Sequence, residues 1–426
     1  MAKIFIKTFG CSANYNNSEI MAGLLVKAGH QIVKQPEKSD VIIINTCTVK
    51  LPTENRVKKS IRNFLKLKKK IIVAGCMPEV QKDLIRDIAP NASLVGPHYV
   101  KNIAEVAEKI LADKTVEKIG KRNEVKLNCP ELRENQIIQI VQISEGCNGI
   151  CTYCIVKLAK GKLFSYPKDK IVKQIESGIK DGCKEVWLTS QDTAAYGQDI
   201  NTNLAELLKK IILIKDDFKV RIGMMDPNNL IPILDDLIVL MKSEKIFKFL
   251  HIPVQSGNDE ILKKMKRPYI INKFKKIIRK LRKEIPEITI STDIICGFPS
   301  ETEEQFNDSV KLIREIKPDV LNISRFWPRP GTKAALMENQ VHGRITKKRS
   351  QLITREFNKI CTEKNKKWLG WKGEILMDEI GQEGSFIGRN YCYKPVVIKS
   401  NKDLLGKKVN VKIIKTTNHT LRGKII

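Results

Sequence analysis

The stretch SEGCNGICTYC, residues 144–154, carries three of the chain's 11 cysteines within eight positions. Cys147, Cys151 and Cys154 form the pattern CxxxCxxC directly after the apolar run IIQIVQI at 137–143, which predicts a β-strand. Three thiolates on a short loop can bind three irons of a cubane 4Fe-4S cluster, and the fourth iron then has no protein ligand. An open coordination position also separates catalytic from structural metal sites. We therefore predict a cluster that leaves room for a substrate or cofactor.

The alternative for this loop is a zinc site. Zinc in a structural site takes four Cys or His ligands at close spacing. The nearest further cysteines are Cys129 and Cys183, and no histidine lies close to the loop. The spacing therefore favours iron and sulfur.

The composition is that of a globular protein with an anionic partner. The chain has 426 residues, of which 42% are hydrophobic and 29% charged, enough for two or three domains. It shows neither a signal peptide nor a membrane-spanning stretch, so we expect a cytoplasmic protein with reduced thiols and no membrane contact. Runs such as KLKKK at 66–70 are ordinary solvated faces, but a net charge of +30 favours RNA or DNA as a partner.

Residues 137–330 alternate apolar strand candidates with amphipathic helices about six times, and a basic helical stretch follows at 340–367. The strand candidates are 137–143, 185–190, 219–224, 247–252, 288–295 and 319–324. Six βα units predict a partial (β/α)6 barrel, which we assign to residues 137–360. Barrels of this kind place their chemistry at the C-terminal ends of the strands.

The first 118 residues also alternate strand and helix, which predicts a doubly wound parallel sheet and an α/β protein overall. Cys11, Cys47 and Cys76 each end a predicted strand, in KIFIKTFGC, DVIIINTC and KIIVAGC. Such ends share one edge of a parallel sheet, so these three thiolates can converge on a second open cluster. A single such cysteine would be read as a small buried hydrophobe. Residues 119–136 are polar and aperiodic, and we interpret them as a linker.

The C-terminal residues 361–426 predict a small all-β barrel, because short apolar runs alternate with turn residues without helices between them. From 362 onward this part holds 14 lysines and arginines against 6 acidic residues, which favours nucleic-acid binding over a purely structural tail. Our candidates for phosphate contact are Arg389, Lys407, Lys408 and Lys412.

Two three-cysteine patterns in this order resemble the methylthiotransferases, a branch of the radical S-adenosylmethionine (SAM) enzymes. The resemblance spans nearly the whole chain and includes Tyr153 before the last cysteine, HIPVQSG at 251–257, TDIICGFPSET at 292–302 and RPGTKA at 329–334. It implies an N-terminal methylthiotransferase domain, a radical SAM barrel and a C-terminal TRAM RNA-binding barrel. One departure is Lys160, where the family usually has arginine; lysine keeps the charge but loses the bidentate fork.

The resemblance also implies the chemistry and the cofactors. The open iron at 147–154 would chelate SAM, and an electron from the reduced cluster would release a 5′-deoxyadenosyl radical that activates a carbon–hydrogen bond. The second 4Fe-4S cluster, on Cys11, Cys47 and Cys76, would carry the sulfur that is methylated by another SAM and transferred. Such a reaction needs an electron donor and a sulfur source as partners.

Three branches of the family differ in their target. NTCTVKLPTEN at 45–55 and VWLTSQDTAAYGQDINTNL at 186–204 most resemble the archaeal and eukaryotic branch that modifies threonylcarbamoyladenosine at tRNA position 37, on carbon-2 of adenine. The alternatives are a ribosomal-protein aspartate and isopentenyladenosine in tRNA. A further alternative is that the protein is not an enzyme but an RNA-binding metalloprotein. This alternative predicts that SAM is not cleaved.

Further polar residues end the predicted barrel strands. Gln191, Asp192, Asp293 and Arg325 should point toward the SAM pocket, together with Tyr153. Each of the strand-end residues, taken singly, fits a capping or salt-bridge role equally well. His251 ends the fourth strand and is either part of this site or a buried, hydrogen-bonded histidine.

Overall fold

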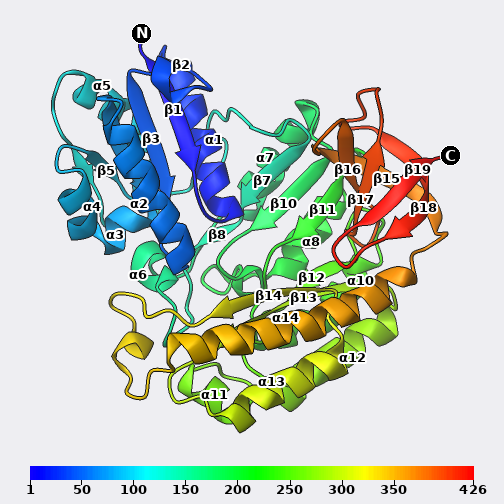
Figure 1. Cartoon of the computed structure of the whole chain (residues 1–426). Coiled ribbons are helices and arrows are strands. Elements are labelled where there is room, and N and C mark those ends of the chain that lie inside the picture. The colour runs from blue at the N-terminus through cyan, green and yellow to red at the C-terminus, as the bar shows by residue number, and fades with distance from the viewer.

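A computed structural model describes all 426 residues, and it contains three regions that Figure 1 colours from blue to red. The blue N-terminal sheet and the red C-terminal barrel lie on opposite sides of the green strands between them (Figure 1). None of the helices combines the length and apolar composition that a membrane crossing requires.

The N-terminal region is a six-stranded parallel sheet in the order β2-β1-β3-β4-β5-β6. Its strands are β1 (Lys3–Thr8), β2 (Gln31–Ile32), β3 (Val41–Thr46), β4 (Lys70–Gly75), β5 (Ser93–Val95) and β6 (Glu117–Lys118). Its helices are α1 (Ser12–Lys27), α2 (Leu51–Leu65), α3 (Cys76–Val80), α4 (Lys82–Ile88) and α5 (Ile103–Leu111). The expected strands are present; β2 and β6, two residues each, are too short for a periodic pattern to reveal.

Both faces of this sheet are covered because side chains alternate along each strand. Val41 and Ile43 of β3 pack into the core that includes α1 and α5, whereas Ile42 and Ile44 pack into the core that includes α2 and α4. A continuous apolar run such as VIIIN is therefore what a central parallel strand requires.

The middle region is a partial barrel of six parallel strands. Its strands are β7 (Ile138–Gln142), β10 (Glu185–Thr189), β11 (Lys219–Ile222), β12 (Phe249–His251), β13 (Thr289–Cys296) and β14 (Val320–Arg325). They form two hydrogen-bonded sheets, β11-β10-β7 and β12-β13-β14, which a parallel bridge between Val220 and Ile246 joins. The strands therefore follow one another in chain order, and the expected (β/α)6 arrangement is confirmed.

The helices of this region cover the outside of the barrel (Figure 1). They are α7 (Lys168–Lys180), α8 (Leu204–Ile212), α9 (Pro227–Leu230), α10 (Leu234–Met241), α11 (Asp259–Lys264), α12 (Ile271–Glu284), α13 (Glu303–Ile316) and α14 (Gly343–Lys366). The short helix α6 (Val156–Lys160) instead lies against α3 of the N-terminal region. A short hairpin of β8 (Ser144–Glu145) and β9 (Phe164–Ser165) frames the cysteine loop.

The C-terminal region is a closed barrel in the order β15-β16-β17-β19-β18. Its strands are β15 (Lys372–Ile380), β16 (Ser385–Arg389), β17 (Pro395–Lys399), β18 (Lys408–Thr416) and β19 (Leu421–Ile425). The expected all-β barrel is confirmed. The sequence did not reveal β16, SFIGR, whose Gly388 packs closely against Met377 and Ile375 of β15 and therefore cannot carry a side chain.

The three regions are packed against one another rather than tethered. Ser12 and Thr189 share a hydroxyl hydrogen bond of 2.8 Å, which joins α1 to the end of β10. On the other side, the Lys394 ammonium group reaches Asp319 at 2.9 Å. Residues 119–136 contain no helix or strand, yet the Lys126 side chain within them is only 1% exposed, so this segment is packed into the molecule.

Candidate active site

The first cysteine triplet surrounds a loop held by the β8–β9 hairpin. The Gly149 N–H donates to Cys147 Sγ at 3.2 Å. A Cβ atom at Gly149 would lie 3.2 Å from Cys147 Sγ and 3.9 Å from Cys151 Sγ, so a side chain there would crowd the thiols. Burial raises the pKa of Cys154 to about 12, and the N–H groups at the start of the following helix oppose that rise. The loop is therefore a cradle of three thiols.

The second triplet gathers three loops at the C-terminal edge of the N-terminal sheet. Cys11 follows β1, Cys47 follows β3 and Cys76 begins the helix after β4. A Cβ atom at Gly10 would lie 2.7 Å from Cys47 Cβ, so the two loops touch. Burial is the main cause that raises the pKa of Cys76 to about 12; Lys160 opposes the rise, and Cys47 and Cys11 contribute to it. The three residues lie where the chain order reverses between β1 and β3, the usual ligand site of such sheets.

Both triplets fit a cubane cluster. No three His, Cys, Asp or Glu side chains are grouped as ligands of one metal ion would be. A cubane takes one thiolate per iron, so its ligands need not converge on one point. All 11 cysteines are free, and each triplet has a glycine, Gly149 or Gly10, at which a side chain would crowd a cysteine of that triplet.

Helix α6 connects the two triplets. It begins two residues after Cys154 and ends at Lys160, and it packs against α3, which begins at Cys76. Five helical residues span about 7.5 Å. The two cysteine sites therefore lie at opposite ends of one short helix.

A buried ionic group supports this helix. Glu145 Oε1 accepts hydrogen bonds from Lys126 Nζ at 2.6 Å and Lys160 Nζ at 3.0 Å, and Glu145 Oε2 accepts one from Tyr166 Oη at 3.2 Å. Burial alone would raise the pKa of Glu145, but the two ammonium groups outweigh it and hold the value at about 2. Lysine at 160 suits this place, since two compact ammonium groups share one carboxylate oxygen.

A cavity of about 170 Å³ opens between the two sites. Both regions contribute to its wall: Val49 and Lys50 follow Cys47, and the rest comes from the barrel mouth. The barrel residues that line it are Tyr153, Cys154, Ile155, Gln255, Asp293, Ile295, Ser324, Arg325, Phe326, Trp327 and Arg329. Tyr153, Asp293 and Arg325 therefore lie together in one cavity next to a cluster cysteine.

Asp293 is fixed by its neighbours. Its Oδ1 atom lies 2.8 Å from His251 Nε2 and accepts a hydrogen bond from Asn322 Nδ2 at 2.7 Å. Burial would raise the pKa of Asp293, but these partners lower it overall, so the carboxylate is ionised. His251 thus orients a residue of the cavity wall.

The other two strand-end residues lie outside the cavity wall. Asp192 is 4% exposed, and its carboxylate accepts hydrogen bonds from Ala194 N, Asp226 N and Asn229 Nδ2 at 3.1, 3.0 and 2.7 Å. These three donors make it a cap within the barrel, and its expected role in cofactor binding stays a prediction. Gln191 keeps a buried Oε1 atom without a protein partner, so its role stays a prediction.

The expected phosphate contacts of the C-terminal barrel separate into two groups. Arg389 donates to Asp378 at 3.0 Å and lies over the Tyr393 ring, so its guanidinium group contributes to the barrel's own packing, and its contact with phosphate stays a prediction. Lys408 pairs with Asp217 at 2.6 Å and thereby joins the barrel to the loop before β11. Lys407 is exposed, although its ammonium group donates to the Asp403 carbonyl at 2.8 Å.

Lys412 belongs to a row of lysines that the sequence did not reveal. Strand register places it directly opposite Lys372 of β15 and Lys424 of β19. All three are exposed and none forms an ion pair. Like charges directly opposite one another are unfavourable, so the row fits an anionic ligand.

Several site residues escaped sequence reasoning. Arg329 lies in the quoted RPGTKA and donates to Thr48 Oγ1 at 3.0 Å and to Glu54, bridging the barrel to α2. Lys50 follows Cys47 by three residues, and Glu145 precedes the first cysteine of the loop. Their closeness in sequence to proposed cysteine ligands was the one feature of the sequence that could have marked Lys50 and Glu145 as site residues.

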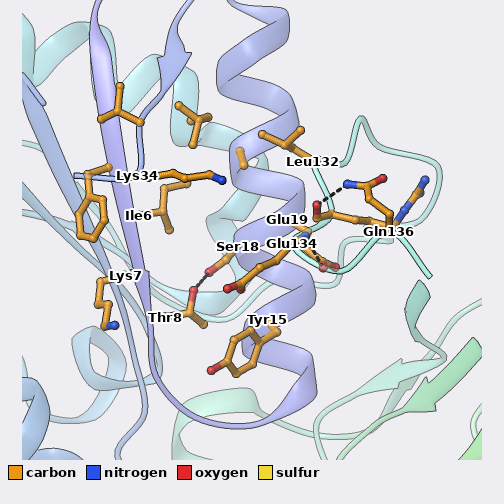
Figure 2. Close-up of a pocket in the computed structure, with 15 residues that line it drawn as sticks. Ile6, Lys7, Thr8, Tyr15, Ser18, Glu19, Lys34, Leu132, Glu134 and Gln136 are labelled. Atoms are coloured by element: carbon orange, nitrogen blue, oxygen red, sulfur yellow. Dashed lines mark hydrogen bonds between the residues drawn. The ribbon is translucent and has the colours of Figure 1, made fainter. Parts of the chain in front are cut away.

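A larger cavity of about 780 Å³ lies away from the cysteines, between β1, α1 and residues 132–136 (Figure 2). Glu19 of α1 lies in its wall; the side chain is buried and its Oε2 atom has no hydrogen-bond partner. Burial, and then the neighbouring Glu131, raise the pKa of Glu19 to about 8. Glu19 is thus protonated in the folded protein at neutral pH.

This protonation predicts a pH dependence of stability. The unfolded carboxyl ionises near pH 4.5 and the folded one near 8, so the folded state holds an extra proton between them and stability falls as pH rises. The free energy of unfolding of Glu19→Gln minus that of wild type should therefore increase by about 1.4 kcal/mol per pH unit between pH 5 and 8. Urea titrations across this range measure it, with the exposed Glu37→Gln as control. A pH-independent difference would contradict the prediction.

Comparisons with solved structures show the fold. TsrM from Kitasatospora setae, a radical SAM methyltransferase, matches with a TM-score of 0.57 and 13% identity over 78% of this chain and 75% of its own. The radical enzyme OxsB matches with a TM-score of 0.53 and 11% identity over 84% of this chain and 55% of its own.

Sequence comparisons show the family. Residues 3–96 match Uncharacterized protein family UPF0004, 141–313 match the Radical SAM superfamily and 369–426 match the TRAM domain. A probable threonylcarbamoyladenosine tRNA methylthiotransferase of Pyrococcus horikoshii is 41% identical over 100% of both chains. The threonylcarbamoyladenosine tRNA methylthiotransferases of Xenopus laevis and Homo sapiens are each 37% identical over 99% of this chain and cover 77% and 74% of their own length. The chain belongs to the threonylcarbamoyladenosine tRNA methylthiotransferase family, and it is a radical SAM enzyme.

Proposed function

We propose that this protein converts N6-threonylcarbamoyladenosine at tRNA position 37 into its 2-methylthio form. The observation that carries the proposal is the pair of three-cysteine sites at the two ends of α6, with a cavity between them lined from both regions. The names of the relatives support the substrate. We keep residues 1–118, 137–360 and 361–426 as the functional units, with 119–136 between them.

The thiolates of Cys147, Cys151 and Cys154 would hold the cluster that binds SAM, and those of Cys11, Cys47 and Cys76 would hold the second cluster. A reduced 4Fe-4S cluster supplies the electron that cleaves SAM and so starts radical chemistry. Tyr153 and the ionised Asp293 would orient SAM in the cavity, and the packed walls would exclude water. The proposed reaction requires an electron donor and a sulfur source. Reduced cysteine thiols require a reducing compartment such as the cytoplasm.

The lysine row of the C-terminal barrel would bind the tRNA backbone. Each phosphate contact that a lysine makes contributes close to one unit to the slope of log affinity against log salt. Replacing Lys372, Lys412 and Lys424 with glutamine should lower that slope by roughly 2 to 3. Filter binding of one tRNA at several salt concentrations measures it. A control variant replaces three other exposed, unpaired lysines, Lys27, Lys276 and Lys283. If both triple variants reduce the salt dependence equally, the lysine row is not a specific binding site for tRNA.

Nucleoside mass spectrometry tests the proposed function. The protein is expressed anaerobically in a host that makes threonylcarbamoyladenosine but lacks a methylthiotransferase for it, and total tRNA is digested. A new 2-methylthio form that disappears with Cys147→Ala is the expected result. An unmodified nucleoside, in cells whose purified protein still cleaves SAM, would reject this substrate and point to the aspartate-modifying branch.

A further inference from the structure

The cavity between the cysteine sites has an excess of positive charge. Its wall carries three cations, Lys50, Arg325 and Arg329, and a single carboxylate, Asp293. Arg329 is neutralised by its ion pair with Glu54. Lys50 and Arg325 then face the single carboxylate of Asp293, so the wall keeps an excess of one positive charge that an entering anion would balance.

Neither Lys50 nor Arg325 has a direct hydrogen-bond or ion-pair partner within the protein. Lys50 is exposed and is close enough to Asp293 to help lower the pKa of that carboxyl. Arg325 is half-buried at the end of β14, with its guanidinium carbon 5.7 Å from the centre of the Trp327 ring. Contact with an aromatic face restricts the guanidinium plane without using its N–H donors. A partly buried cation whose donors are unused is arranged for an anionic ligand.

SAM does not account for this charge. It carries a sulfonium and an ammonium group against one carboxylate, so it is itself a net cation and adds to the positive charge of the cavity in which Tyr153 and Asp293 would orient it. Adenine is neutral, and so is an isopentenyl substituent. The threonylcarbamoyl substituent differs because it ends in a free carboxylate.

We infer that Lys50 and Arg325 bind the carboxylate of the threonylcarbamoyl group, and that this contact selects the modified adenosine over neutral ones. The inference rests on the proposed function, of which it specifies the substrate contact. Arginine is suited to the task because its two parallel N–H groups match the two oxygens of a carboxylate.

The same contact would position the reacting atom. Carbon-2 and the carbon that bears N6 both flank N1 of the adenine ring, so a group that fixes the N6 substituent also fixes the location of carbon-2. Lys50 follows Cys47 by three residues, whereas Arg325 comes from the barrel. A carboxylate held between them would therefore place the base between the two cysteine sites.

Three anticodon stem-loops that differ only at position 37 test the inference. One carries threonylcarbamoyladenosine, one carries the same group with its carboxylate replaced by a primary amide, and one carries adenosine. Affinities are measured by fluorescence anisotropy with the anaerobically reconstituted protein in the presence of SAM. We expect wild type to prefer the carboxylate over the amide by about 10- to 100-fold, the range of a charged hydrogen bond.

In Arg325→Gln and in Lys50→Gln this preference should shrink toward one, and Arg325→Lys should retain part of it. The exposed Lys333→Gln, a few residues further along the chain, is the matched control and should keep the full preference. Equal loss of affinity for all three RNAs would assign the cations to phosphate groups. Weaker SAM binding with the preference intact would assign them to the cofactor. Either result overturns the inference.

Failure of the inference and failure of the proposed function look different. If wild type methylthiolates the carboxylate and the amide stem-loops equally well, the proposed function stands and the inference falls. If wild type modifies none of the three RNAs while cleaving SAM, the proposed substrate itself is wrong.

Discussion

Alanine at Cys11, Cys47 and Cys76 together should lower the iron content from about eight to about four per chain and abolish methylthiolation, while SAM cleavage persists. The reason is the separation of the two sites: α6 lies between the triplets and packs against α3, which carries Cys76, and no cysteine belongs to both triplets. Removing the N-terminal thiolates therefore leaves the loop at 147–154 with all of its ligands.

Three measurements check this expectation in one anaerobic preparation. They are iron by colorimetric assay, 5′-deoxyadenosine after reduction, and the methylthio nucleoside by mass spectrometry. The matched control replaces three cysteines outside both triplets, Cys129, Cys183 and Cys361, and should keep about eight irons. The reciprocal replacement of Cys147, Cys151 and Cys154 should also leave about four irons, but with no SAM cleavage at all. Unchanged iron in the first variant would remove the second cluster from the proposal.

Glu145→Gln should cost about 3–5 kcal/mol in the free energy of unfolding. Glu145 is 2% exposed and is the shared counter-charge of two buried ammonium groups. Glutamine fills the same space but leaves Lys126 and Lys160 as neighbouring cations without an anion. Breaking a buried ion pair from one side is costly because the remaining charge is not solvated.

The other members of the group give a ranking that tests the cause. Lys126→Met leaves a one-to-one pair of Glu145 and Lys160, so it should cost less than Glu145→Gln. Tyr166→Phe removes one hydrogen bond and should cost about 1 kcal/mol. Urea unfolding of all three variants at one pH provides the comparison. If Lys126→Met proved the most harmful, shared neutralisation would not be the role of Glu145.

Local pattern was enough to predict the scaffold. The strand candidates in the first two regions are apolar runs bounded by turns, and β3 is buried at every position as such a run requires. Cysteines at the ends of parallel strands must share an edge of the sheet, so the grouping of Cys11, Cys47 and Cys76 followed from topology alone. Family resemblance added the substrate branch, which the comparisons support.

Local sequence pattern could not predict which strands pair or which side chains form hydrogen bonds with one another. No partner for Asp192 or Arg389 was evident in the sequence, whereas the folded chain hydrogen-bonds them to Asn229 and Asp378 respectively. The lysine row became visible only through strand register, because Lys372 and Lys424 are separated from Lys412 by different distances along the chain.

The sequence by itself determined the elements, their order and the two sets of thiolates, because periodicity and strand-end position are local properties. Only the tertiary structure decided which charges are neutralised. Arg329 pairs with Glu54 across 275 positions of chain, whereas Lys50 and Arg325 line one cavity without a direct ion pair. Coulomb energy depends on separation in space and on burial, and neither can be read from spacing along the chain.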